Sequence, residues 1–187
     1  VNVSRPANYG SLSPTWVETV VKAGLGRDQR DVPTAGIAAV NFSNSGNIQV
    51  SDGNSWVNTG RTFKADTWYR IILKLDFSTH MYSVFTSPAS TPKTPFVPDK
   101  ENLHFVDGSL SAITDIGFMG AYNVNSQQDS WVDEMVVHYI DKLQFVTAPL
   151  TMVKGYASGQ MTVQLQNANS EPQTAWMDLN IELRSST

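Results

Sequence analysis

The sequence predicts an all-β protein built as an antiparallel sandwich. Short runs alternate between apolar and polar residues, most strictly from Thr67 to Phe77, where the odd-numbered positions from Tyr69 onward are apolar. Gly, Pro, Asn, Asp and Ser separate these runs, as expected for turns between strands. The one helical candidate, Trp16 to Ala23, is rich in β-branched residues and alternates with period two, so a strand explains it better.

Four strands are expected before the Thr67–Phe77 strand, each ended by a polar turn. They span residues 15–23, 36–42, 48–50 and 56–59. In the first of them, Val17 and Val21 would face one side of the sheet and Trp16 and Glu18 the other, because side chains alternate along a strand. Asp52 to Asn54 is expected to form the turn before the fourth strand.

A hairpin turn at Ser78 and Thr79 is expected to lead into a return strand from Met81 to Thr86. Ser87 to Asp107 is expected to be a long loop, because its four prolines between Pro88 and Pro98 exclude a central strand. The next strands are expected over residues 112–119 and 131–139. Between them, residues 122–130 are expected to form a loop, since they are rich in Asn, Gln and Ser.

The pattern changes after Asp141, so we expect two units, residues 1–141 and residues 142–187. The second unit would contain strands over residues 143–146, 161–165 and 176–183. Three strands do not readily close a sandwich. We favour part of a second sandwich, whose Met177, Leu179 and Ile181 would need cover from the remaining domains of a parent protein or from a second chain. The alternative is that these strands dock on the first unit.

Composition narrows the class of protein. The 187 residues carry a net charge of −4, only 16% are charged, and there is no cysteine, so disulfides and thiol chemistry are excluded. The basic residues form no cluster, which argues against a nucleic-acid partner. No apolar run reaches the ~18 residues of a membrane span. The neutral polar composition and the start at Val1 lead us to expect a fragment of a larger, extracellular, secreted polypeptide.

Four segments carry a resemblance to a known family. They are Thr67–Asp76, beginning Thr-Trp-Tyr-Arg-Ile, then Tyr82–Phe85, Ala112–Phe118 and Trp131–Val137. Their order resembles that of concanavalin A-like lectin/glucanase domains, the laminin-G-like jelly rolls of bacterial polysaccharide-acting proteins. The tail from Leu143 resembles the start of an immunoglobulin-like domain. The resemblance implies a concanavalin-like jelly-roll sandwich followed by part of an immunoglobulin-like β unit.

The resemblance and the aromatic content together predict a non-catalytic carbohydrate-binding module. Sugars stack on flat aromatic rings, while amides and arginine bind their hydroxyl groups, so polysaccharide or another glycan is the expected partner. The predicted ligand-binding residues are Trp56, Trp68, Arg70, Tyr122, Asn123, Asn125, Gln127 and Trp131. Trp68 and Arg70 share the outward row of their strand and would form a platform. The alternative for each tryptophan is ordinary packing in the core or at a sheet edge.

Structural calcium is the one cofactor that the sequence suggests, because jelly-roll modules often bind it through carboxylate and carbonyl oxygens. The candidate ligands are Asp28, Asp31 and Asp133, and capping of turns by these side chains is the alternative. The three histidines are too scattered for a zinc site.

Two other classes of function stay open: a structural spacer or adhesion domain, and a fragment of a glycoside hydrolase or polysaccharide lyase. Hydrolysis needs two facing carboxyl groups, and only Glu18 and Glu134 could meet, if their strands were neighbours. A lyase would use a Tyr or His as the base together with an Arg or Lys, but we expect Arg70, Lys74 and His138 to be ordinary exposed charges. The resembling family's paired-carboxylate strand motif is absent, so no catalytic residue is predicted.

Overall fold

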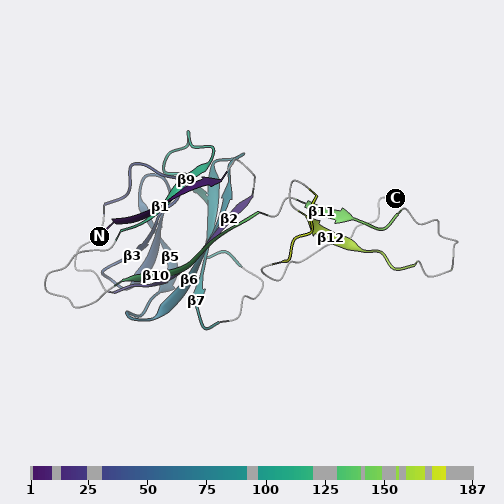
Figure 1. Ribbon diagram of the computed structural model, residues 1–187. Helices are drawn as coiled ribbons and strands as arrows, with labels where there is room; N and C mark the ends of the chain where they lie inside the picture. The colour runs from purple at the N-terminus through teal and green to yellow at the C-terminus, as the bar shows by residue number, and fades with distance from the viewer. Residues whose placement is uncertain are drawn as a thin grey trace.

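The computed structural model describes residues 2–9, 14–24, 31–91, 97–119, 130–139, 142–148, 155, 159–166 and 170–175. These residues contain strands and no helix, and every pair of neighbouring strands is antiparallel (Figure 1). The strands are β1 (Asn2–Tyr9), β2 (Thr15–Lys22), β3 (Val40–Phe42), β4 (Asn47–Ser51), β5 (Trp56–Thr62), β6 (Trp68–Asp76), β7 (Met81–Pro88), β8 (Lys100–His104), β9 (Ile113–Met119), β10 (Trp131–Tyr139), β11 (Lys142–Phe145) and β12 (Val163–Gln166). The predicted all-β antiparallel class is therefore confirmed.

The described strands form four sheets. The largest has the order β10-β2-β6-β7-β8, and smaller sheets are formed by β3-β4-β5 and by β1-β9. These three sheets enclose a common core in a sandwich-like arrangement, while β11 and β12 form a two-stranded sheet that lies apart from the sandwich (Figure 1). Residues 176–183, expected to be a further strand, lie outside the described residues.

The alternation in β6 fixes which side of the large sheet faces the core. Tyr69, Ile71 and Leu75 are at most 9% exposed and belong to the main apolar cluster, with Leu73 packed against it. The same cluster takes side chains from both smaller sheets, including Ile48 and Val50 of β4 and Ile113 of β9. Burial of such side chains is the main driving force for the sandwich, at about 1.5–3 kcal/mol for each large apolar group.

A buried tyrosine joins the two layers through the core. The Tyr82 hydroxyl of β7 donates a hydrogen bond to the backbone carbonyl of Ser51 in β4, and both residues are almost fully buried. Burial raises the pKa of the Tyr82 phenol well above its ordinary value, because the charged form would lose its hydration. Tyr82 therefore stays neutral and acts as an interlayer hydrogen-bond donor.

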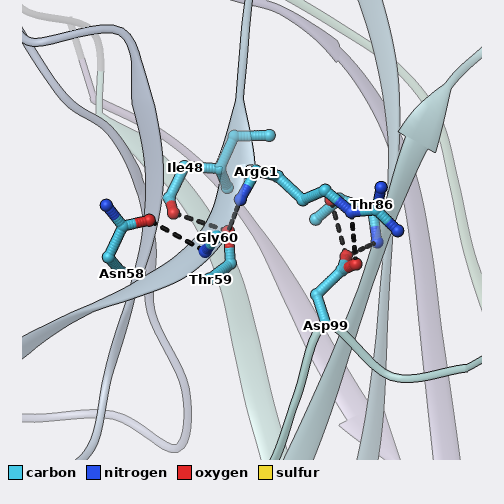
Figure 2. A network of polar contacts seen from close by, with 7 residues as sticks. All are labelled: Ile48, Asn58, Thr59, Gly60, Arg61, Thr86 and Asp99. Carbon is cyan, nitrogen blue, oxygen red and sulfur yellow. Dashed lines mark hydrogen bonds and ion pairs between the residues drawn. The ribbon is translucent and has the colours of Figure 1, made fainter.

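A second interlayer contact centres on Asp99, just before β8. Its carboxylate accepts hydrogen bonds from the backbone N–H of Thr86 at 2.6 Å and from the Thr86 hydroxyl at 2.7 Å. Figure 2 shows the guanidinium of Arg61, from β5, reaching the same carboxylate, with a 2.6 Å contact from Nε. Asp99 is thus a buried acceptor that links β7 to the opposite sheet.

The main correction to the predicted elements is β8. The segment from Ser87 to Asp107 was expected to be a loop, yet Lys100–His104 pairs with β7 as the edge strand of the large sheet. The prolines precede this strand, and an edge strand needs hydrogen bonds on one side only, so they do not prevent it. Strand β3 is also shorter than the expected 36–42, and β1 was not expected. The described residues hold no helix of the length and apolarity that crossing a membrane would require.

Candidate functional site

The outer face of the large sheet holds a group of charged and aromatic side chains. Antiparallel register places β2 between β10 and β6, so that Val136, Glu18 and Ile72 form one row across three strands. A second buried cluster lies on this face and consists of Trp16, Ile72 and Phe85. Simple alternation would place all even-numbered residues of β6 in solvent. Because of this packing, some of them are buried instead.

Glu18 is the most deeply buried acid on this face. Its side chain is 3% exposed, and its Oε1 accepts a hydrogen bond of 2.9 Å from Nε of Arg70. Arg70 lies one row further along β6, and its side chain is 12% exposed. A carboxylate removed from water in this way requires a charged partner, and Arg70 supplies one.

Arg70 also holds the chain that follows β7. Its Nη1 donates to the carbonyl of Thr91 at 3.1 Å, and its Nη2 donates to the carbonyl of Ala89 at 3.5 Å. The planar guanidinium can make several such bonds at once. Arg70 thereby ties the end of β7 to the buried carboxylate in β2.

His138 of β10 approaches the same carboxylate from the other side. Its Nε2 lies 3.5 Å from Oε2 of Glu18, and its side chain is 21% exposed. Glu18 therefore lies between Arg70 and His138. The expectation that Arg70 and His138 are ordinary exposed charges was wrong, because register across neighbouring strands brings both to one buried acid.

A different arrangement occupies the end of this face. Trp131, Lys22 and Trp68 form one row across β10, β2 and β6. The Lys22 ammonium lies 5.5 Å from the ring centroid of Trp131 and 5.7 Å from that of Trp68. Trp68 is 36% exposed and Trp131 54% exposed. We call these three residues the Trp–Lys–Trp row; it is a surface on which two indoles flank one cation.

The opposite end of the face repeats the pairing of lysine with tryptophan without the exposed surface. Lys74 places its ammonium 5.6 Å from the ring centroid of Trp16. Trp16 is only 9% exposed and contacts Phe85 in the second cluster. This end is therefore structural packing, and the Trp–Lys–Trp row is the accessible aromatic surface of the face.

The structure brings together only some of the predicted ligand-binding residues. Trp68 and Trp131 share the Trp–Lys–Trp row, whereas Arg70 is directed to Glu18 and the chain after β7. Trp56 begins β5 in the other layer of the sandwich. The remaining predicted residues, Tyr122, Asn123, Asn125 and Gln127, lie outside the described residues.

Lys22 is the residue of this site that sequence reasoning missed. The feature that could have indicated it is its place on the even-numbered face of β2, the face that also carries Trp16 and Glu18. Only the pairing of β2 with both β6 and β10 shows that this position falls between two tryptophans.

Two of the three predicted calcium ligands, Asp31 and Asp133, lie among the described residues. Asp31 and Asp133 are exposed, and Oδ1 of Asp133 accepts the backbone N–H of Glu134 at 2.8 Å. Asp28 lies outside the described residues. The part of the chain that the structure describes contains no group of three or more His, Cys, Asp and Glu residues arranged for a metal ion. Calcium binding stays a prediction.

Glu18 and Glu134 are the two acids that the sequence suggested as a carboxylate pair for hydrolysis. Strands β2 and β10 are neighbours, as that pair requires, but Glu134 lies in a β-bulge where the register shifts between Asp133 and Val136. Glu134 is exposed with a φ of 50°, whereas Glu18 is buried beside Arg70. The two acids therefore occupy different environments, one solvated and the other held in an ion pair.

Comparison of the chain with models of protein families, with curated proteins and with solved structures gave no match.

Proposed function

We propose that the protein is a non-catalytic carbohydrate-binding module and that the Trp–Lys–Trp row is its binding surface. The observation that carries this proposal is the exposure of Trp68 and Trp131 in one register row of the five-stranded sheet. Two strand spacings separate their backbones, about 10 Å, so the row is wide enough to contact a sugar ring. Exposed indoles present apolar area at low entropic cost, which is why they are enriched at binding surfaces.

The rest of the face supports binding without catalysis. The Glu18 carboxylate is engaged by Arg70 and lies beside His138, so these groups stabilise the sheet and the end of β7. In this proposal they are the frame that holds in place the strands carrying the two exposed indoles. The antiparallel sandwich is compatible with a concanavalin-like jelly roll, and β11 with β12 is compatible with the first strands of an immunoglobulin-like unit. We further propose that the module belongs to a secreted multidomain protein.

A glycan array with matched tryptophan variants tests the function. Trp68→Ala and Trp131→Ala are expected to weaken binding at least about tenfold, the usual effect of removing a central aromatic contact. Trp56→Ala is the control, because Trp56 lies in the other layer and should leave binding unchanged. Thermal unfolding of each variant checks that the fold persists.

The same array can overturn the proposal. If the protein bound no glycan, a spacer or adhesion role would replace carbohydrate binding. If Trp56→Ala abolished binding while Trp68→Ala and Trp131→Ala did not, the binding surface would lie on the three-stranded sheet. Release of reducing ends or unsaturated products from a polysaccharide would show catalysis and contradict a pure binding role.

A further inference from the structure

A positive charge lies at the centre of the Trp–Lys–Trp row. The Lys22 ammonium is within cation–π distance of both indoles, at 5.5 and 5.7 Å from their centroids. In the described part of the chain, no acidic side chain forms an ion pair with Lys22. The cation is thus stabilised by aromatic faces, and no carboxylate of the described residues is paired with it.

The other cations of this face are used differently. Arg70 is held by Glu18 and by the carbonyl of Thr91, and Lys74 lies over the buried ring of Trp16. Asp133, which lies near this row on β10, accepts a hydrogen bond from the backbone N–H of Glu134. Lys22 is therefore the cation that accompanies the exposed indoles.

We infer that the Trp–Lys–Trp row selects glycans that carry carboxylate groups, namely polysaccharides containing uronic acids. This inference rests on the proposed carbohydrate-binding function. A sugar ring stacked on Trp68 or Trp131 would bring its substituents beside Lys22, and a carboxylate there would form a charge-assisted hydrogen bond with the ammonium. A neutral hydroxyl at the same place would make only the weaker, neutral-acceptor bond.

Ligands that differ only in whether their carboxylates are free or esterified measure the effect of the ligand's charge on affinity. We would measure the Kd of the full chain, by titration calorimetry, for oligogalacturonate and its methyl ester, and for alginate oligomers and their neutral ester. An ion pair at a partly exposed site is worth about 1 kcal/mol, so the acid form of a pair should bind about fivefold more tightly than the ester. Added salt should reduce this preference, because it screens an exposed pair.

Three variants assign the preference to Lys22. Lys22→Met keeps the length and packing of the stem but removes the charge, so it should bind acid and ester equally. Lys22→Arg keeps the charge and should retain the preference. Lys100→Met removes one positive charge from β8, at the far edge of the sheet, and should behave like the wild type.

The outcomes separate this inference from the function on which it rests. Equal affinity of the wild type for acid and ester, binding of neutral or sulfated glycans alone, or a preference that survives in Lys22→Met would overturn the selection of carboxylates. In each of these cases the binding function stands if Trp68→Ala still loses affinity. Failure to bind any glycan would overturn both.

Discussion

The ion pair between Glu18 and Arg70 gives the sharpest test of how the outer face is held together. The two side chains are 3% and 12% exposed, and their Oε1 and Nε atoms are 2.9 Å apart. Removing one member of such a pair leaves a buried charge without its partner, at a cost of about 3–5 kcal/mol. Replacing both members by apolar residues of similar size is often close to neutral.

We therefore expect Glu18→Leu and Arg70→Met each to lower the free energy of unfolding by about 3 kcal/mol. In a chain of this length, that corresponds to a decrease in Tm of about 6–12 °C. The double variant should be more stable than either single variant. It should lie about 1 kcal/mol below the wild type, because the carbonyls of Ala89 and Thr91 lose their donors.

Urea unfolding followed by tryptophan fluorescence measures all three variants, and Arg61→Met is the control. Arg61 also contacts a buried acid, Asp99, at 2.6 Å, but its own side chain is 61% exposed. Asp99 keeps both hydrogen bonds from Thr86 when Arg61 is replaced, and an exposed arginine gains little from its ion pair, so Arg61→Met should cost less than about 1 kcal/mol. If the effects of Glu18→Leu and Arg70→Met were simply additive, or if Glu18→Leu were as mild as the control, the pair would not be the buried unit described here.

Two further predictions concern acids elsewhere in the sandwich. Asp99→Ala leaves the backbone N–H and the hydroxyl of Thr86 without their acceptor, so urea unfolding should show a loss of about 2–3 kcal/mol and hydrogen exchange at the Thr86 amide should accelerate; unchanged exchange there would contradict the contact. The backbone N–H groups of Asn54 and Ser55 hold the pKa of the Asp52 carboxyl below its ordinary value. A lowered pKa in the folded state stabilises the protein above the unfolded value of about 3.9, and this contribution is lost as pH falls through the folded value. The stability difference between the wild type and Asp52→Asn should therefore shrink below about pH 4, and a constant difference would refute the assignment.

The local alternation of the sequence was sufficient to predict β2, β6, β7 and β10 of the large sheet and one layer of the core. The odd-numbered row from Tyr69 to Phe77 faces the interior as predicted, since period-two patterning depends only on the chain itself. Strand β10 was predicted with its observed bounds, and Trp68 is on the outer face. The turn at Asp52 is also confirmed, because its carboxylate caps the N–H groups of Asn54 and Ser55.

Properties that depend on which strands are neighbours could not be predicted in the same way. Arg70 was assigned to a sugar platform because its strand points it outward, but β2 places Glu18 beside it and turns it into a structural residue. Trp56 was grouped with Trp68 on residue type alone, and sheet topology separates them. Strand β8 was missed because prolines near Asp99 indicate a loop, and the strand begins after them.

The contrast between Arg70 and Lys22 follows from the chemistry of the two cations. A guanidinium presents several donors in one plane, so Arg70 can bind a carboxylate and two backbone carbonyls together and remain buried. An ammonium is a compact, strongly hydrated charge on a flexible stem, which suits Lys22 at its half-buried position between two exposed indoles. The strand order β10-β2-β6 places one cation in the frame of the face and the other between two exposed indoles. Lys22 is the positive charge of the Trp–Lys–Trp row, so if the proposed binding function holds, Lys22→Met is expected to change which glycans bind without disturbing the fold.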